Sequence, residues 1–433
     1  MLTHGWGRYP QHNAKLMQPQ TVPDAAQLLS EEGPVLGRGM GRSYGDSALA
    51  DTLISTRHLN RLHSFDAQTG LLACAAGISL AELLDVFVPR GWFLPITPGT
   101  QFVSIGGAIA SDVHGKNHHL HGCFSAGVES IELLLADGSQ VLCSRTERPE
   151  LFHATCGGMG LTGLIVAVSL RLLRIESAYI QQTTYKAANL EEALQLFEAH
   201  SASTYSVAWI DCLANGAALG RSLLMVGEHA RDGQLLLPAK RALSVPLDMP
   251  AALLNRYSVQ AFNELYYQRI RKPVSKQRVS FESFFYPLDG IQQWNRMYGK
   301  QGFVQYQFVI PKAAGLQGMR AILERISASH RGSFLAVLKT FGAANHNLLS
   351  FPMEGYTLAL DFKLEAGLME LLDELDSMVL AHGGRLYLAK DARMSEATFK
   401  QSQPNWQQFQ EIRAQYGALG KFASLQSRRL GLD

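Results

Sequence analysis

Glycine is spread very unevenly along this chain of 433 residues, and this unevenness limits the folds open to it. Gly, Ser and Ala crowd the first 165 residues, where glycine clusters occur at 37–45, 99–107, 115–127 and 157–163. One helix is well marked there: it begins at Ser79, with Glu82 three residues later as in a capping box, and ends at Gly91. This part of the chain therefore predicts short apolar strands joined by tight glycine loops.

From about residue 179 the pattern changes to longer helices and strands. Strands are predicted at 204–211, 303–310, 333–341 and 356–362, and helices from Asn189, near 313–328 and at 365–382. The stretch 228–284 contains prolines and basic residues without clear periodicity, which predicts an irregular, mobile segment. The length of the chain favours two domains, or one split domain with an insert.

Composition and charge exclude several classes of protein. A hydrophobic share of 47% and a charged share of 18% are typical of a globular protein. A net charge of +2 provides no general attraction to nucleic acid, so no nucleic-acid partner is expected. Five cysteines without a CxxC pair predict buried thiols rather than disulfides or a zinc site. Without a signal peptide or a membrane-spanning apolar run, we expect a cytoplasmic protein, with contact to the inner membrane at most peripheral.

Two of the glycine clusters predict a nucleotide site. Residues 37–46, GRGMGRSYGD, place four glycines and two arginines within ten residues, and 98–119 form a second such segment. Backbone N–H groups of glycine loops point into one concavity, where they bind phosphate oxygens. Tight turns in a β-rich domain explain one such loop equally well, whereas two long loops favour a dinucleotide.

Two other patterns in this region are rejected. GMGLTG at 158–163 matches GxGxxG, but a helix is predicted before it and a strand after it, the reverse of a Rossmann loop. The four histidines between 114 and 121 lack acidic partners at helical spacing, and Lys116 among them would repel a cation, so no metal is expected. A histidine and a lysine beside a flavin ring are more plausible, because both stabilise its negative reduced form.

Alternation along two predicted strands groups polar side chains. Gln305 and Gln307 share one face of the first strand, and Lys339 and Phe341 share one face of the second. Neutral amides side by side suit hydrogen bonds to hydroxyl groups. A solvated sheet face explains either strand alone about as well. Lys390, at the end of the strand-like RLYLAKD, occupies a place that is usually a surface position.

Taken in order, nine segments resemble the polyprenylphosphoryl-ribose oxidases (the decaprenylphosphoryl-β-D-ribose 2′-oxidase family). They are GRGMGRSYGD, PGT, GGAIASDVHGKNHH, GGMGLTG, WNRMYG, GFVQYQFVIP, LKTFG, LSFP and GGRLYLAKDAR, and together they cover nearly the whole chain. That family belongs to the vanillyl-alcohol oxidase and p-cresol methylhydroxylase superfamily of FAD proteins. The resemblance implies an α+β fold with a split, non-Rossmann FAD-binding domain of the p-cresol methylhydroxylase type, at 1–177 and 384–433. The substrate domain, 178–383, would hold an antiparallel sheet flanked by helices.

The resemblance also implies noncovalent FAD and a set of site residues. FAD would contact Arg38, Gly39, Met40, Gly41, Arg42, Ser43, Tyr44, Gly45, Asp46, Gly99, Ser104, Ile105, Gly106, Gly107, Ser111, Asp112, Val113, His114, Ile165 and Tyr387. Lys116, Gln305, Gln307, Lys339 and Phe341 would surround the sugar, with Lys390 and His114 as catalytic residues. Lys390 would accept the hydroxyl proton or stabilise charge on the reduced ring, and burial would lower its pKa.

By this resemblance the chain is an oxidoreductase acting on a CH–OH group. It would oxidise the 2′-hydroxyl of a polyprenylphosphoryl-β-D-ribose to the 2′-keto sugar, and a separate NAD(P)H-dependent reductase would complete epimerisation to the arabinose donor for cell-wall polysaccharide. An aldonolactone or alditol oxidase, or an enolpyruvyl-sugar reductase, on the same fold is the alternative. A flavin-binding protein without enzymatic activity is a third, and it would not need Gln305, Gln307, Lys339 and Lys390 together.

The sequence departs from the family at three places. Ala359 stands where mycobacterial members have a cysteine, and Phe285 and Tyr286 replace a Tyr-His pair. The segment 228–284 resembles the family least, and it is interpreted as a lid over a lipid phosphate. Its cations Arg269, Arg271, Lys272, Lys276 and Arg278 would meet phosphates, and Leu253, Leu254, Tyr266 and Tyr267 would receive the prenyl chain. A solvated loop accounts for this segment at least as well.

Overall fold

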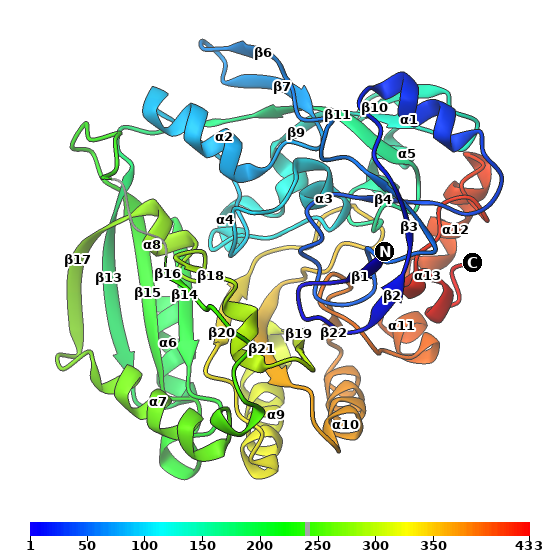
Figure 1. Ribbon diagram of the computed structural model, residues 1–433. Helices are drawn as coiled ribbons and strands as arrows, with labels where there is room; N and C mark the ends of the chain where they lie inside the picture. The colour runs from blue at the N-terminus through cyan, green and yellow to red at the C-terminus, as the bar shows by residue number, and fades with distance from the viewer. Residues whose placement is uncertain (239–242) are drawn as a thin grey trace.

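The structure is a computed structural model that describes residues 1–238 and 243–433 (Figure 1). Its first part contains a five-stranded antiparallel sheet in the order β10 (Gln140–Ser144), β9 (Val128–Leu134), β11 (Leu164–Arg171), β7 (Leu71–Ala75), β6 (Leu62–Asp66). A parallel three-stranded sheet lies beside it, in the order β3 (Lys15–Met17), β5 (Thr52–Ser55), β4 (Leu36–Arg38). The short pairs β1 (Leu2–His4) with β2 (Gln11–Asn13), and β8 (Trp92–Phe93) with β12 (Leu173–Arg174), complete this part.

Short helices connect these strands. They are α1 (Val22–Leu29), α2 (Leu80–Phe87), α3 (Ile105–Ala110), α4 (His118–His121) and α5 (Pro149–Thr155). The predicted capping box at Ser79 and Glu82 begins α2, and a short 3-10 turn carries the chain on to Gly91 at φ 78°. The reversed order around 158–163 is confirmed, since α5 comes before GMGLTG and β11 after it.

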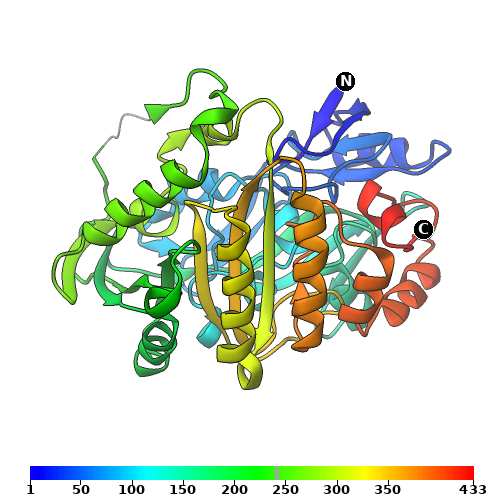
Figure 2. The same cartoon turned by 90° about the horizontal axis from the view of Figure 1, so that it is seen from below.

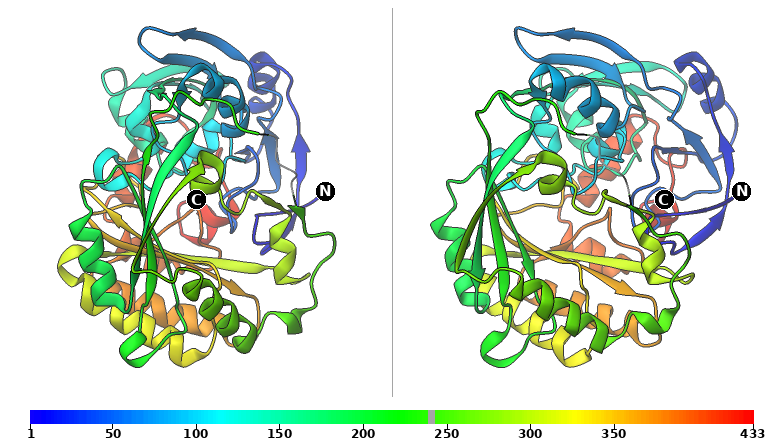
Figure 3. Two further views of the ribbon diagram at one scale, coloured as in Figure 1. Left: turned by 90° about the vertical axis from the view of Figure 1, so that its left-hand side faces the viewer. Right: turned by 60° about the vertical axis from the view of Figure 1, so that its left-hand side comes forward.

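The second part is an eight-stranded antiparallel sheet. Its order is β17 (Val274–Ser280), β13 (Tyr179–Ala187), β15 (Ser222–His229), β14 (Tyr205–Ile210), β20 (Ala336–Phe341), β21 (Gly355–Lys363), β19 (Phe303–Pro311), β22 (Arg385–Leu386). Helices α6 (Leu190–Ala199), α9 (Gly315–Ser329) and α10 (Leu368–Ala381) cover one face, as Figure 2 shows from below. The opposite face is turned toward the glycine-rich loops of the first part (Figure 3).

Strand register decides which side chains share that second face. Gln305 lies opposite Asp361, and Gln307 opposite Ala359, which in turn lies opposite Val337. Residues directly opposite in an antiparallel pair project to the same side of the sheet. The predicted pairing of Gln305 and Gln307 on one face is therefore correct, and it extends to residues on two further strands.

The segment 228–284 is not irregular throughout. Its second half contains α7 (Arg256–Gln268), β17 at the edge of the large sheet, and α8 (Phe281–Phe285). Asn255 caps α7 through a capping box with Ser258, a signal present in the sequence. The small strand β16 (Leu243–Ser244) of this segment pairs in parallel with β18 (Ile291–Gln292), which follows the segment. Residues 239–242 of this segment lie outside the described residues.

The chain returns to its first part after α10. Helices α11 (Glu396–Ser402), α12 (Trp406–Gln415) and α13 (Leu425–Arg429) lie beside the N-terminal strands in Figure 1. Val35 and Phe422 form a parallel bridge, and the N–H of Leu425 donates to the carbonyl of Leu49. RLYLAKD is not one strand: β22 has two residues, and a turn follows in which Lys390 lies.

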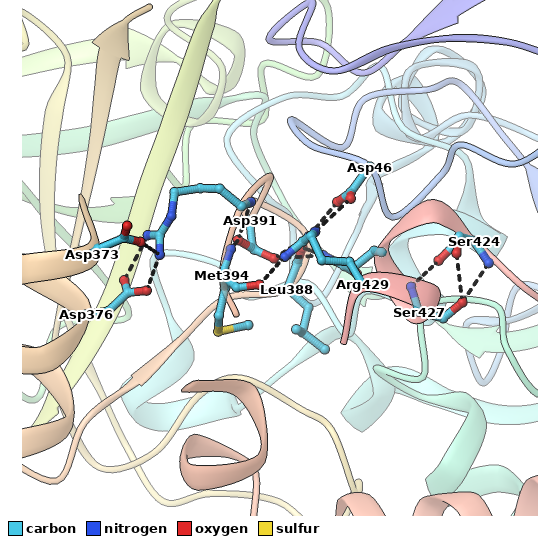
Figure 4. A network of polar contacts seen from close by, with 11 residues as sticks. Asp46, Asp373, Asp376, Leu388, Asp391, Met394, Ser424, Ser427 and Arg429 are labelled. Carbon is cyan, nitrogen blue, oxygen red and sulfur yellow. Dashed lines mark hydrogen bonds and ion pairs between the residues drawn. The ribbon is translucent and has the colours of Figure 1, made fainter. Parts of the chain in front are cut away.

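A buried ion-pair network holds this returning segment (Figure 4). Arg429 at the end of α13 contacts Asp46 at 2.7 Å and Asp391 at 2.8 Å, and both aspartates are nearly inaccessible to solvent. Its Nη1 also donates to the Met394 carbonyl. One guanidinium thus joins the end of the first glycine loop, the turn after β22 and the C-terminal helix.

All five cysteines are buried and free, as predicted. Within residues 1–238 and 243–433, no helix is both long and apolar enough to cross a membrane.

Arg429→Met is expected to lower the free energy of unfolding by about 3–5 kcal/mol, because it leaves two buried carboxylates without their cation. The neighbouring Arg428→Met is the matched control, since Arg428 forms an exposed pair with Asp51 and should change stability by less than about 1 kcal/mol. Urea denaturation followed by tryptophan fluorescence measures both. Equal effects of the two variants would contradict the role given to Arg429.

Candidate active site

A cavity of about 530 Å³ lies between the polar face of the large sheet and the two glycine-rich loops. Cavities of this size usually hold a cofactor or a small-molecule substrate. Its lining combines residues 37–44 and 97–100 with side chains from β14, β19 and β20 and from the turn after β22. Segments remote in sequence therefore meet at one site.

The glycines of the first loop are required by close backbone contacts. A Cβ on Gly39 would lie 2.1 Å from the Ser104 hydroxyl oxygen, so only glycine lets the two loops touch. Gly41 has φ +63°, the left-handed region that glycine adopts at little cost. A Cβ on Gly45 would lie 1.9 Å from the Asp391 carbonyl oxygen. The first loop is thus packed tightly against both the second loop and the returning segment.

Most of the predicted cofactor residues line the cavity. They are Arg38, Gly39, Met40, Gly41, Arg42, Ser43, Tyr44, Gly99, Ser104, Gly106, Gly107, Ser111, Val113, His114, Ile165 and Tyr387. Gly45, Asp46, Ile105 and Asp112 are not among the lining residues, although they are adjacent in sequence.

Two of these four are carboxylates with structural partners. Asp46 pairs with Arg429. Asp112 accepts hydrogen bonds at 2.7–2.8 Å from the side chains of Asn345, Asn347 and Ser350, and so holds the loop before β21. These contacts support the walls of the cavity from behind.

His114 is buried on the polar side of the cavity. The Gln307 amide donates to its Nε2 at 3.0 Å, an arrangement that requires an unprotonated Nε2. Its Nδ1 has no hydrogen-bond partner among the described residues. Burial, followed by the charge of Lys339, holds the pKa of His114 well below its ordinary value. The imidazole is therefore neutral and retains one N–H for a bound molecule.

Three lysines, Lys116, Lys339 and Lys390, line the same part of the cavity. Burial, together with the neighbouring cation Lys339, lowers the pKa of Lys116 to about 7. Burial and the charge of Lys390 lower the pKa of Lys339 to about 7 as well. Burial lowers the pKa of Lys390 to about 8, although Asp361 opposes this shift. An ammonium group loses its hydration on burial, so neutral amines become accessible near physiological pH.

Asp361 does not line the cavity, but it supports the site through Gln305, and it was not predicted from the sequence. Its Oδ1 accepts a hydrogen bond of 2.5 Å from the Gln305 amide, and its Oδ2 has no partner among the described residues. Burial raises the pKa of Asp361 to about 7, against the opposing effects of Gln305 and Lys390. The signal that could have identified it is its register opposite Gln305, which becomes visible only once β19 and β21 are paired.

Lys390 lies 4.0 Å from the centroid of the Tyr44 ring. Tyr44 belongs to the first glycine loop, and its N–H donates to the Ala389 carbonyl at 3.1 Å. The aromatic face stabilises the cation without neutralising it. The loop predicted to hold the cofactor thus also positions the predicted catalytic lysine.

Phe341 does not line the cavity, although it was predicted to contact the sugar. It is 1% exposed, and its ring lies 4.7 Å from His114 and 4.5 Å from His118 between ring centroids. Lys339 contacts the cavity while Phe341 supports His114 from behind. Gln305, Gln307, Lys116 and Lys339 line the cavity, and Ala359 and Phe285 do so as well.

The cavity continues away from the lysines along the sheet. This outer part is lined mostly by apolar side chains, Val207, Trp209, Met225, Tyr266, Val279, Leu335 and Val337, together with the polar Gln182, Gln277 and Arg269. The Tyr266 and Trp209 rings lie 4.7 Å apart, and the Arg269 guanidinium lies 3.7 Å from the Tyr266 centroid. One end of the site is therefore cationic and polar, and the other is apolar.

Comparison with known proteins shows similarity to FAD-binding oxidases. Residues 10–144 match a family model described as an FAD binding domain, which confirms FAD as the cofactor. Over 42% of its length the chain is 28% identical to L-gulonolactone oxidase of Bos taurus, of which 42% is covered. An uncharacterised protein of Streptomyces coelicolor is 31% identical over 82% of this chain and all of its own length.

Decaprenylphosphoryl-beta-D-ribose oxidase of Mycolicibacterium smegmatis is 38% identical in an alignment that covers 99% of this chain and 97% of that protein. The chain is an FAD-dependent oxidoreductase and belongs to the decaprenylphosphoryl-ribose oxidase family.

Proposed function

We propose that this protein oxidises the 2′-hydroxyl of a polyprenylphosphoryl-β-D-ribose to the 2′-keto sugar, with noncovalent FAD as the acceptor. The observation that carries the proposal is the two-ended cavity. Gln305, Gln307 and the three lysines form a polar end that suits a hydroxylated, anionic sugar phosphate, and an apolar sheet surface continues from it. A substrate with a sugar at one end and a long hydrocarbon chain at the other matches both halves.

The residues around the cavity fit FAD. Two glycine loops meet there, Arg38 and Arg42 lie in its wall, and buried His114 has an N–H to offer. Gly99 faces open space, with no atom within 4 Å of a Cβ built on it. The FAD-binding domain would comprise 1–177 and 384–433, because the C-terminal segment bonds to the strands of the first part. The substrate domain would be 178–383.

Lys390 would act as the base. Its lowered pKa supplies a neutral amine that can accept the hydroxyl proton, while FAD, when bound, supplies the acceptor for the hydride from the same carbon. Tyr44 holds the lysine on one side, and the charge of Asp361 keeps its pKa from falling further. Neutral His114 and the two glutamines would orient the sugar through hydrogen bonds.

The alternative is an oxidase of a small soluble sugar, as the partial likeness to L-gulonolactone oxidase suggests. A small sugar would leave the apolar half of the cavity without a role. The long apolar wall therefore favours the lipid-linked substrate. The keto sugar formed would require a separate NAD(P)H-dependent reductase to become arabinose, and contact with the membrane that holds the lipid would be peripheral.

FAD is expected to leave the protein on acid denaturation. In the part of the chain that the structure describes, no cysteine lines the cavity, and Nε2 of His114 is engaged by Gln307. The absorbance spectrum of the supernatant after acid precipitation measures the released flavin. A yellow precipitate over a colourless supernatant would show a covalent bond instead.

Lys390→Met is expected to retain FAD and to reduce flavin about 10²–10⁴ times more slowly with polyprenylphosphoryl-ribose, the usual worth of a positioned base. Lys400→Met is the control, because Lys400 also lies over an aromatic ring, at 4.3 Å from Trp406, but away from the cavity. Anaerobic stopped-flow absorbance follows the reduction. A normal rate in the Lys390 variant would place the base elsewhere, at His114 or Lys339.

The reduction rate is expected to rise with pH and to level off above the pKa of Lys390, about 8, because only the neutral amine accepts a proton. Asp361→Asn should move the midpoint of this rise to lower pH. The negative charge of Asp361 favours the ammonium form, so its removal lowers the pKa of Lys390. Anaerobic flavin reduction is measured for both proteins from roughly pH 6 to pH 10, which brackets a lowered lysine pKa. If the midpoint of the Asp361→Asn variant equals that of the parent, Lys390 is not the titrating base.

A further inference from the structure

Helix α7 carries apolar side chains both on the face that packs on the sheet and on the face turned toward solvent. Val259 and Tyr267 point inward with the buried Asn263, as expected for a helix packed on a sheet. Its outward face should be polar, yet Tyr257 is 71% exposed and Leu265 74% exposed. Figure 3 shows this helix on the outside of the molecule.

The outward apolar surface extends beyond the helix. Leu253, just before α7, is 58% exposed, and Phe262 is 42% exposed. A grouping of large apolar side chains on the surface marks an interaction site more often than chance exposure. We name Leu253, Tyr257, Phe262 and Leu265 the α7 surface.

The charge around the α7 surface is mainly positive. Residues 249–276 contain five cations and a single acidic residue, Glu264, which pairs with Arg221. Three of the cations, Arg271, Lys272 and Lys276, lie exposed in the turn after α7 and in β17. Arg278, which was grouped with them from the sequence, differs because it pairs with Asp232 at 2.7 Å. Apolar side chains flanked by cations are typical of helices that lie in the interface of an anionic bilayer.

The α7 surface is continuous with the outer end of the cavity. The Phe262 ring stacks on Tyr266, with centroids 5.6 Å apart, and Tyr266 contacts Trp209 inside the cavity. Arg269, which is exposed, lies over Tyr266 and lines the cavity at the same time. A row of aromatic rings thus leads from the outer surface to the apolar wall, with a cation beside it.

We propose that the α7 surface docks on an anionic membrane and places the outer end of the cavity against the lipid phase. The polyprenyl chain of a substrate would then pass along Phe262, Tyr266 and Trp209 while its tail stays in the bilayer. Arg269 would meet the phosphodiester where it leaves the interface. The route taken by the substrate rests on the proposed function, whereas the docking itself does not. A protein partner fits this surface less well, because lysines such as the flanking Lys272 and Lys276 are depleted at protein interfaces.

The test is co-sedimentation of the FAD-loaded protein with vesicles of phosphatidylcholine, with and without phosphatidylglycerol. We expect binding to the anionic vesicles that weakens as salt is added. The triple variant Leu253→Gln, Tyr257→Gln, Leu265→Gln should bind at least about tenfold more weakly, because the interfacial affinity depends on buried apolar area. Since all three side chains are exposed, the fold should be unaffected.

A matched triple variant serves as control. Leu62→Gln, Leu142→Gln and Leu419→Gln also replace exposed apolar side chains, in β6, in β10 and between α12 and α13. In Figure 1 these elements lie across the molecule from α7. This variant should bind vesicles like the parent. Arg271→Gln, Lys272→Gln and Lys276→Gln together should remove most of the preference for anionic vesicles.

The inference is overturned if the parent does not bind anionic vesicles, or if the α7 triple variant binds as tightly as the parent. It is also overturned if that variant turns a dimer into a monomer while vesicle binding is unchanged, since the surface would then join two copies of the chain. Flavin reduction by a short-chain, water-soluble polyprenylphosphoryl-ribose is measured in parallel. Vesicle binding without flavin reduction would contradict the proposed function and leave the docking surface standing.

Discussion

The site depends on one partly buried guanidinium, which pairs with two buried carboxylates. Arg429 pairs with Asp46, which ends the first glycine loop, and with Asp391, which follows Lys390 directly. The loop and the lysine are more than 340 residues apart in sequence, yet this contact brings them together, because a buried carboxylate is stable only beside its cation. The Tyr44 ring then lies 4.0 Å from the Lys390 amine, and the cavity wall closes around both.

Burial in turn determines the chemistry that the cavity can perform. Three lysines in water would all be charged at neutral pH, whereas here the pKa values of Lys116, Lys339 and Lys390 lie at about 7, 7 and 8. Desolvation lowers the pKa of all three lysines, and repulsion from a neighbouring lysine lowers the pKa of Lys116 and Lys339 further. Asp361 counters this lowering at Lys390 alone, so one amine differs from its neighbours in the pH at which it becomes neutral. Lys390 therefore keeps its proton to a higher pH than Lys116 and Lys339 do.

The large sheet connects this polar centre to the outside. Its cavity-facing side changes along its width from Gln305, Gln307 and Lys339 to Val207, Trp209 and Met225, and Tyr266 on α7 and Arg269 just after α7 lie beyond them. Antiparallel pairing places the strand residues on one face, although they come from the four strands β19, β20, β14 and β15. The polar and the apolar end of the cavity thus lie along one continuous sheet, and the surface beside its outer end carries exposed apolar side chains.

Local patterns in the sequence determined the glycine loops, the caps of α2 and α6, the shared face of Gln305 and Gln307, and the rejection of a Rossmann loop at 158–163. These features depend on residues only a few positions apart, so they can be recognised without a fold. Only the tertiary structure decided that Asp46 and Asp112 support the loops from outside the cavity, that Phe341 lies behind His114, and that Asp361 faces Gln305. The stretch 228–284, where periodicity is weak, contains a capped helix that forms the outer end of the cavity. Strand register and the burial of charge depend on partners distant in the chain, and no local pattern contains that information.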